Sequence, residues 1–350
     1  MRPLGCAPSM KQCGRMVSRR GRNPDWLFVA RDNNYGLTRD VELLMAAIVK
    51  AGGSADFATI RDRSLIDWVM RRQAAQNIVH IERVFPRWLS AGAKNWLIPN
   101  QERFPRRHAG RLRKIDRVLA KTLHAEQIFS HIGVPTTHIG FTSEDRQDIT
   151  VEKNWNSILH LAGGSTLKGT EDILALWRAH PEWPQLFLVQ KAANAPRSVP
   201  HNVTLYSGHI DDWELKHLQN ACGIHLCPSR AEGWGHHIVE AMSVGAVVVT
   251  TDGPPMNEHI DATCGVLVEV ERSERRHLGE SFFVDRKALE TAIIGLLAMD
   301  SATKRTIGMQ ARERYEKIGE SFSQNISNHL GLSIQAPHEA RQHTPAISHS

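Results

Sequence analysis

Residues 227–258 of the chain read CPSRAEGWGHHIVEAMSVGAVVVTTDGPPMNE. The stretch begins at the end of an apolar run, Gly223–Cys227, and it contains a second apolar run at Ala246–Thr250. The residues between the two runs suit a glycine-bearing turn followed by a short helix. A strand, a helix and a further strand in this order are typical of a parallel β-sheet. The stretch therefore predicts the α/β fold class.

The turn in this stretch carries the chemistry. Glu232 lies just before the turn, and Glu240 lies about one helical turn inside the predicted helix. Gly233 and Gly235 allow the backbone to turn sharply and to approach a ligand closely. A helix that starts near His236 leaves its first N–H groups without partners, and such a helix end binds anions. A diphosphate suits this site.

This arrangement resembles the donor-binding core of the group-one family of retaining glycosyltransferases. The matching positions are the two glutamates, which the family signature separates by seven intervening residues, and the residues that follow them: Glu232, Glu240, Ala241, Met242, Gly245 and Val247–Thr250. The resemblance implies two Rossmann-like domains with parallel sheets that face each other across a cleft, the B-type glycosyltransferase fold. It also implies that the C-terminal domain holds most of a nucleotide-sugar donor.

Roles for individual donor-side residues follow from the resemblance and from their positions. Glu240 is expected to accept hydrogen bonds from the ribose hydroxyls, Glu232 to lie beside the donor sugar, and the His236 N–H to face phosphate. A second family landmark is the series of strand, glycine-bearing loop and helix around Lys168, which implies that Lys168 contacts the diphosphate. Many relatives have an arginine five residues earlier, where this chain has Gly163.

Gly36 matches a glycine in the loop that follows the first strand of the family's N-terminal domain. That loop closes over the donor phosphates or over the acceptor, so Gly36 is a donor-binding candidate. The alternative is that Gly36 only makes a turn between a strand and a helix.

Three polar residues are candidates for the acceptor side of the cleft. His80 and Glu82 alternate with apolar residues at the end of a predicted strand, Asn77–Glu82, and Lys121 ends another, Arg117–Thr122. Ligands of open α/β sheets bind at the carboxyl ends of the strands. The alternative for His80 and Glu82 is a hydrogen-bonded polar pair with no contact to a ligand.

Composition and length agree with two domains. The chain has 350 residues, of which 41% are hydrophobic. The expected segments, in chain order, are a disordered basic leader (1–23), an N-terminal acceptor domain (24–143), a linker (144–154), a C-terminal donor domain (155–317), a helix that crosses back to the first domain (318–335) and a disordered tail (336–350).

The net charge of +6 comes in part from basic clusters at 19–22 and 103–114. Such clusters are typical of solvated faces, of contact with anionic lipid or of contact with an anionic acceptor. Nucleic acid is a poorer match, because these clusters lack interleaved aromatic residues. No apolar run is long enough for a membrane span or a secretory signal. A cytoplasmic enzyme is expected, with peripheral contact at the inner membrane face as one option.

Neither a metal nor a disulfide framework is indicated. The five cysteines are odd in number and lack metal-ligand spacing. His236 and His237 are adjacent, so on a helix their side chains point about 100° apart, and no third ligand is spaced to join them. The resemblance likewise implies a metal-independent enzyme that needs no cofactor beyond its nucleotide-sugar substrate.

The function predicted is that of a retaining, hexosyltransferase-like glycosyltransferase. It would move a sugar from a nucleoside diphosphate to a hydroxyl acceptor, which is a glycan, a lipid-linked molecule or a small molecule, in cell-surface glycan or glycoconjugate synthesis. One alternative is a nucleotide-sugar epimerase on the same fold, which would form product without an acceptor. Another is a non-catalytic nucleotide-sugar or glycan-binding relative, which Gly163 favours.

Overall fold

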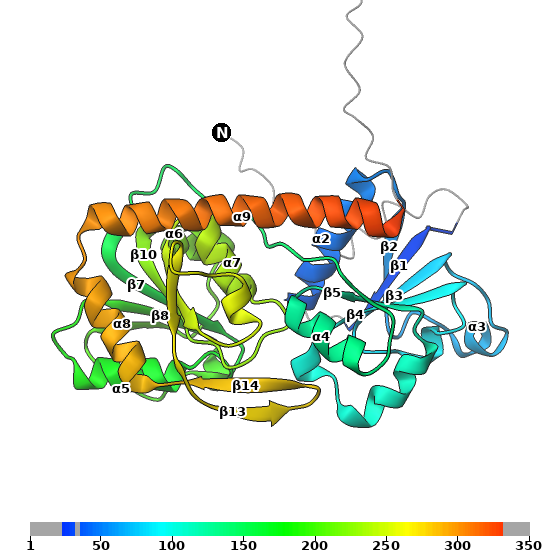
Figure 1. Ribbon diagram of the computed structural model, residues 1–350, viewed down its shortest axis with the longest axis horizontal. Helices are drawn as coiled ribbons and strands as arrows, with labels where there is room; N and C mark the ends of the chain where they lie inside the picture. The colour runs from blue at the N-terminus through cyan, green and yellow to red at the C-terminus, as the bar shows by residue number, and fades with distance from the viewer. Residues whose placement is uncertain (1–22, 32–35, 332–350) are drawn as a thin grey trace, which may run out of the picture.

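The chain folds into two lobes that lie side by side, joined along one edge by a single long helix (Figure 1). The computed structural model describes residues 23–31 and 36–331. The expected leader (1–23) and tail (336–350) therefore fall almost wholly outside the described residues. Each lobe contains a parallel sheet with helices packed on it, so the α/β fold class with two Rossmann-like domains is confirmed.

The N-terminal sheet has the strand order β2-β1-β3-β4-β5-β6, and every neighbouring pair is parallel. Its strands are β1 Trp26–Ala30, β2 Ala55–Thr59, β3 Asn77–Glu82, β4 Lys94–Pro99, β5 Arg117–Ala120 and β6 Thr136–His138. Its helices are α2 Gly36–Lys50, α3 Leu65–Val69 and α4 Leu123–His131, with 3-10 turns η1 Pro86–Trp88, η2 Gln101–Arg103 and η3 Arg106–Lys114. All residues of β1 and β3 are buried, as expected for strands covered on both faces.

The C-terminal sheet has the order β12-β11-β10-β7-β8-β9 and is also parallel. Its strands are β7 Asn154–Gly163, β8 Leu186–Gln190, β9 Val203–Tyr206, β10 Cys222–Cys227, β11 Val247–Thr251 and β12 Gly265–Val268. The helices are α5 Thr170–Ala179, α6 Asp212–Ala221, α7 His236–Ser243, α8 Arg286–Ala298 and α9 Ser301–Leu330, with 3-10 turns η4 Ala192–Asn194 and η5 Met256–Glu258. Strands β10 and β11 are wholly buried, which explains their continuous apolar sequence.

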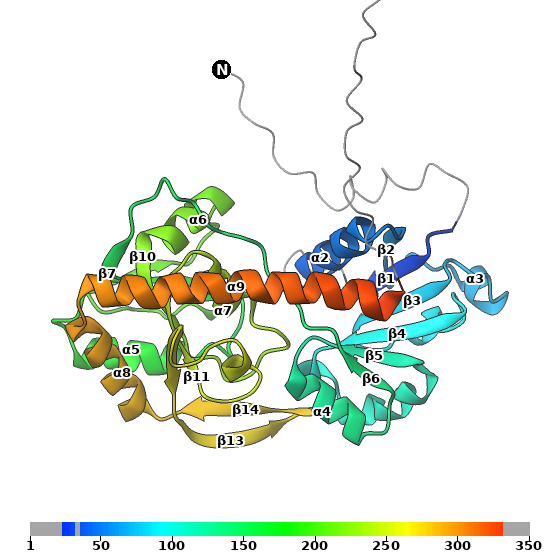
Figure 2. The ribbon, with the colours of Figure 1, turned by 45° about the horizontal axis from the view of Figure 1, so that its top comes forward.

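Helix α9 runs along both domains, as two views of the ribbon show (Figures 1 and 2). The sequence suggested a separate crossing helix over 318–335, whereas the structure has one helix from Ser301 to Leu330. Tyr315 and Phe322 of α9 join a buried apolar cluster that also contains Phe28 of β1 and Met242 of α7. Because this cluster takes side chains from both sheets, the two domains share one core at their contact.

A charged segment after β12 forms a hairpin that the sequence did not predict. Its strands are β13 Val270–Arg276 and β14 Gly279–Val284, which pair antiparallel. The hairpin runs toward the N-terminal domain (Figure 1), and its tip contacts that domain where Arg106 Nε donates to the His277 carbonyl oxygen at 2.8 Å. Phe282 and Val284 of β14 are buried, whereas Phe283 lies under the guanidinium groups of Arg230 and Arg272. The exposed residues of β13 are charged except Ser273, so this strand has no apolar alternation.

The segment predicted as a charged linker contains a buried cation. Arg146 is 1% exposed, and its guanidinium bonds Gln219 Oε1 at 2.9 Å and pairs with Asp212 at 2.9 Å. Its backbone N–H also donates to Ser243 Oγ. These contacts fix the segment on the C-terminal domain.

Among the described residues, no helix is long and apolar enough to cross a membrane.

Candidate active site

The predicted donor residues gather where the C-terminal sheet meets the N-terminal domain. Strand β10 ends at Cys227, and the loop after it carries Glu232 and leads into α7, which begins at His236. Gly235 caps this helix with φ +103°, a left-handed conformation that favours glycine. The first intrahelical donors are the N–H groups of Ile238 and Val239, which bond the Gly235 carbonyl. The N–H groups that precede them are therefore available to an anion.

Lys168 and Glu232, which lie far apart in the chain, form an ion pair. Lys168 Nζ lies 2.6 Å from Glu232 Oε1 and 3.0 Å from His237 Nδ1. Burial, reinforced by the charge of Lys168, lowers the pKa of His237 well below its usual value, so its ring is neutral at pH 7. Nδ1 then accepts from the lysine, and Nε2–H donates to Ser229 Oγ at 3.0 Å. His237 thus orients the ammonium group toward the loop.

Glu240 connects the two domains. It is 3% exposed, and its Oε1 accepts a 2.6 Å hydrogen bond from the guanidinium of Arg39, on α2 of the N-terminal domain. Its Oε2 accepts from Gln219 Nε2 at 3.1 Å. A ribose that binds Glu240 would meet a carboxylate held by both domains. Arg39 is a cation beside the predicted nucleotide site.

His236 takes part in a second contact between the domains. Its Nε2 lies 2.7 Å from Asp40 Oδ1, and its Nδ1 lies 2.9 Å from Ser143 Oγ. The other Asp40 oxygen accepts from Lys121 Nζ at 2.9 Å. Burial alone would raise the pKa of Asp40, but Lys121 and His236 outweigh it and lower that pKa to about 2. The acceptor-side candidate Lys121 is 2% exposed and neutralises a buried carboxylate.

Two of the remaining predicted residues are the glycines Gly36 and Gly233. Gly36 is the first residue of α2, and the loop before it lies outside the described residues. Gly233 lies against Asn100, since a Cβ atom at Gly233 would come within 2.3 Å of Asn100 Oδ1. This contact needs glycine. The role of each residue toward a ligand stays a prediction.

His80 and Glu82 both have protein partners. His80 is fully buried: its Nε2 bonds Asn95 Oδ1, its Nδ1 accepts from the Phe85 N–H, and burial lowers its pKa to about 4. Glu82 pairs with Arg83. Both ring nitrogens of His80 thus have protein partners. For this histidine, the structure fits the alternative of a hydrogen-bonded side chain with no contact to a ligand.

Two glycines near Lys168, Gly163 and Gly169, differ in the space available for a side chain. Both have positive φ, +55° for Gly163 and +69° for Gly169, but a Cβ at Gly163 meets nothing within 4 Å, whereas one at Gly169 would lie 2.4 Å from the Pro228 carbonyl oxygen. We expect Gly163→Ala to cost about 1 to 2 kcal/mol of unfolding free energy from backbone strain alone. Gly169→Ala should cost more, because the backbone of β10's exit loop must also shift.

Urea unfolding of both variants measures this difference. Gly295→Ala, inside α8 with open space around it, is the control and should stabilise by about 0.5 to 1 kcal/mol. Equal costs at the two positive-φ glycines would contradict the close approach to Pro228.

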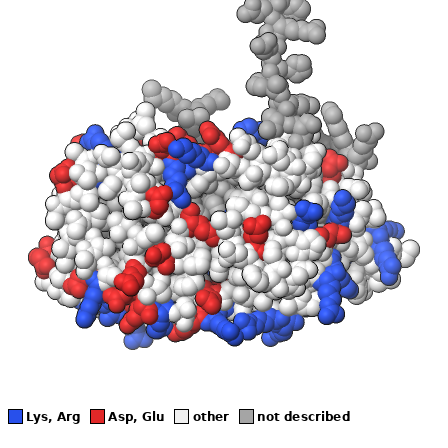
Figure 3. All heavy atoms as spheres, viewed as in Figure 1, with Lys and Arg blue, Asp and Glu red and all other residues white. Residues whose placement is uncertain are grey.

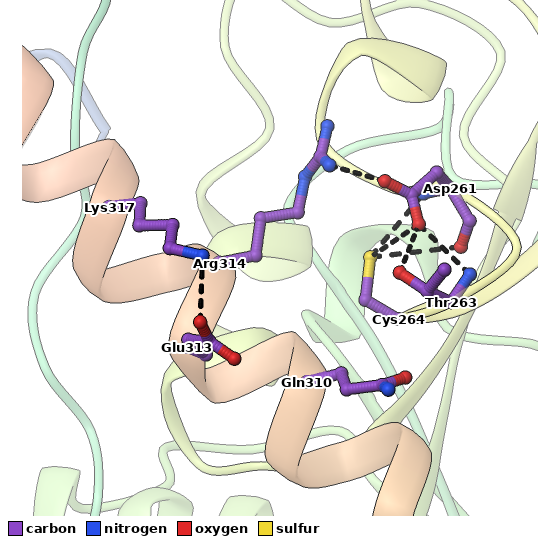
Figure 4. A pocket seen from close by; sticks show the side chains of 7 residues that line it. All are labelled: Asp261, Thr263, Cys264, Gln310, Glu313, Arg314 and Lys317. Carbon is purple, nitrogen blue, oxygen red and sulfur yellow. Dashed lines mark hydrogen bonds and ion pairs between the residues drawn. The ribbon is translucent and has the colours of Figure 1, made fainter.

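A surface pocket lies away from the predicted donor residues. It has a volume of about 340 Å³ and lies between α9 and the loop before β12, as Figure 4 shows. Its charged side chains pair with one another: Arg314 with Asp261 at 2.5 Å and Lys317 with Glu313 at 2.7 Å. None of the predicted donor residues lines it.

The structure adds residues that sequence reasoning missed. They come from segments of the N-terminal domain or from the end of the donor motif, and each touches a predicted residue: Arg39, Asp40, Gln101, Ser143 and His237. Arg39 and Asp40 lie within one turn of Gly36, so that glycine was a usable signal. Gln101 lies just after the end of β4, and the end of a strand is also the position that selected His80 and Glu82.

A family model, described as glycosyl transferases group 1, matches residues 195–278. This segment contains Glu232 and Glu240 but not Lys168. The matched segment of the chain is similar to the glycosyl transferases of group 1, and the two parallel sheets give the fold that this resemblance implies. The resemblance to the group-one family, drawn from the Glu232 to Thr250 stretch, is confirmed by the match.

Several solved structures share the fold of this chain. A glycosyltransferase from Rickettsia africae has a TM-score of 0.67 at 15% identity, with 88% of this chain and 97% of that chain covered. HepE of Anabaena, in complex with UDP and glucose, has a TM-score of 0.65 at 15% identity, with 88% and 100% covered. Sucrose-phosphate synthase of Thermosynechococcus elongatus has a TM-score of 0.67 at 15% identity, with 89% and 98% covered. No curated protein sequence matches the chain.

Proposed function

We propose that the chain is a retaining glycosyltransferase that moves a sugar from a nucleoside diphosphate to a hydroxyl acceptor. The observation that carries the proposal is the pairing of Lys168 with Glu232 beside the start of α7. A cation and a helix N-terminus together suit a departing diphosphate, whose negative charge grows as the glycosidic bond breaks. The partly buried Glu232 would then face the sugar.

The mechanism proposed is electrostatic. Lys168 and the first N–H groups of α7 stabilise the leaving diphosphate, and the N-terminal domain orients the acceptor hydroxyl on the same face of the sugar. The acceptor proton passes to the leaving phosphate oxygen. No metal or cofactor is assigned a step.

A donor panel tests the proposal. UDP, GDP and ADP sugars would be compared by thermal shift and by release of the nucleoside diphosphate, with UDP-glucose first because HepE was solved with it. A bound sugar nucleotide that is cleaved faster with an added hydroxyl acceptor supports transfer. Binding without any turnover supports the non-catalytic alternative, which Gly163 favours. Product formed from donor alone, with the nucleotide retained, supports an epimerase.

Glu240→Ala should weaken binding of the free nucleoside diphosphate by about tenfold to a hundredfold. The reason is the loss of charge-assisted hydrogen bonds to ribose, worth about 1.5 to 3 kcal/mol. Calorimetry on the nucleotide measures this. The control is Glu144→Ala, which removes the other carboxylate that pairs with Arg39 but is half exposed. Unchanged affinity in a folded Glu240→Ala variant would remove Glu240 from the nucleotide site.

We also propose peripheral contact with an anionic membrane surface, in a cytoplasmic enzyme of glycan or glycoconjugate synthesis. The support is charge: Lys and Arg side chains gather along the lower edge of the face in Figure 3, and the basic segments η3 and β13 lie on that side in Figure 1. Each basic residue near an anionic bilayer contributes about 1 kcal/mol. The acceptor of such an enzyme would be lipid-linked.

A further inference from the structure

The segment that follows β4 lies directly against the donor loop. After Pro99 the chain passes through Asn100 into the short turn η2. Gln101 Nε2 donates to the Glu232 carbonyl oxygen at 2.9 Å, and Asn100 touches Gly233. The carboxyl end of a central strand of the N-terminal sheet therefore faces the residue predicted to lie beside the donor sugar.

Two side-chain oxygens in this segment are buried and have no hydrogen-bond partner within the described part of the chain. They are Gln101 Oε1 and Glu102 Oε2, in residues that are 1% and 5% exposed. A buried acceptor without a partner costs about 1 to 3 kcal/mol, and such atoms are rare in folded proteins. The amide of Gln101 is planar and its nitrogen is bonded to the donor loop, so its unpartnered oxygen lies beside the same loop.

The charges around Glu102 point to the same place. Burial raises the pKa of Glu102 to about 7, and the negative charge of Glu232 adds to this effect, whereas a hydrogen bond from its own backbone and the charges of Lys121 and Arg103 oppose it. Glu102 is therefore within electrostatic reach of both a donor-side and an acceptor-side candidate. When ionised, a carboxylate accepts hydrogen bonds from hydroxyl groups, and when protonated it also donates one.

The tip of the β13–β14 hairpin covers this segment. The Leu278 N–H donates to the Gln101 carbonyl at 3.3 Å, and a Cβ at Gly279 would lie 3.0 Å from Gln101 Cγ. The tip is also held by Arg106, through the bond to the His277 carbonyl. This hairpin projects from the C-terminal domain toward the other lobe (Figure 1), and its movement would expose the parts of Gln101 that it contacts.

We propose that Gln101 and Glu102 form a subsite for the hydroxyl groups of a sugar acceptor, with Gln101 Oε1 and Glu102 Oε2 as the hydrogen-bond acceptors. The inference rests on the proposed glycosyl transfer and adds the residues that recognise the acceptor. Gln101 and Glu102 are neighbours, and each has one side-chain oxygen that can accept a hydrogen bond. A molecule with several hydroxyl groups can bond both oxygens, whereas a simple alcohol can bond only one. The subsite lies next to Glu232, where an acceptor hydroxyl must approach the donor sugar.

Kinetics test the subsite with the donor that the panel identifies. The acceptor probe is a mixture of methyl glycosides of glucose, galactose, mannose and N-acetylglucosamine. In Glu102→Leu we expect the apparent acceptor KM to rise at least about tenfold, with donor Kd by calorimetry unchanged, and Glu102→Gln should fall between this variant and the wild type. Glu313→Gln on α9 is the control. An unchanged acceptor KM in Glu102→Leu overturns the subsite, and so does a wild-type protein that cleaves the donor but transfers to none of the glycosides.

Stability provides a readout that needs no ligand. The pKa of Glu102 is raised by folding, so the folded state holds a proton that the unfolded chain releases, and the residue destabilises most above about pH 7. Glu102→Leu should therefore unfold at higher urea concentration than the wild type at pH 8, and the gain should shrink at pH 5. A variant that is less stable at both pH values makes Glu102 a structural residue and overturns the subsite. If no donor of the panel binds, the proposed function fails. The urea measurement still decides whether Glu102 destabilises the folded protein or stabilises it.

Discussion

Lys168→Ala is expected to lower kcat by about a hundredfold to a thousandfold, while donor affinity falls by less than about tenfold. Removing one preorganised group that stabilises transition-state charge typically costs this much in rate. Lys168 would meet a diphosphate whose charge increases as the sugar leaves, so its contribution is larger in the transition state than in the donor complex. With Gly163 in place of the arginine that many relatives have, position 163 itself adds no cation to this work.

Initial rates over a range of donor concentrations separate the two effects. Lys168→Met keeps the apolar stem without the charge and should behave like the alanine variant, whereas Lys317→Ala removes an exposed lysine of α9 and should have wild-type rates. A loss confined to KM would mean that Lys168 binds donor and transition state equally. Full activity in the alanine variant would assign the phosphate charge to Arg39 of the other domain.

The local sequence predicted the fold because the strands of a parallel sheet are buried on both faces and therefore read as apolar runs. Strands β10 and β11 and helix α7 agree with the expected positions within a residue. The β13–β14 hairpin was missed since its outer strand is almost entirely charged and gives no apolar periodicity. Its position depends on contacts with Gln101 and Arg106, which lie far away in the chain.

The candidate site was predictable to the extent that its residues share one segment. Glu232, Glu240 and His236 occupy a single strand-turn-helix unit, whose spacing carries the signal. Arg39 and Asp40 reach that unit only because α2 packs across the domain boundary, and sequence spacing does not encode this contact. Lys121 shows the same limit: its place at a strand end suggested the cleft, but only the fold reveals its buried partner Asp40.

Asp40→Asn should cost about 3 to 5 kcal/mol of unfolding free energy at pH 7. Asp40 and Lys121 are almost fully buried and lie 2.9 Å apart, so neutralising the aspartate leaves an ammonium group without a counterion in the interior. His236 of the other domain loses its carboxylate hydrogen-bond partner in the same change. Urea unfolding at neutral pH measures the cost.

The double variant Asp40→Asn/Lys121→Met separates the ion pair from simple loss of packing. The second change removes the buried ammonium group that has lost its counterion. The unfolding free-energy cost of the double variant should therefore be smaller than the summed costs of the two single variants by at least about 2 kcal/mol. The pH dependence gives an independent check. The folded-state pKa of Asp40, about 2, lies below its usual value, so this carboxylate stabilises the fold above about pH 4 and loses that effect as the pH falls toward 2. Asp40→Asn should abolish this loss of stability at low pH. If the unfolding free-energy costs of the two single variants simply add in the double variant, and if the loss of stability at low pH is unchanged in Asp40→Asn, then Lys121 does not depend on Asp40 for its burial.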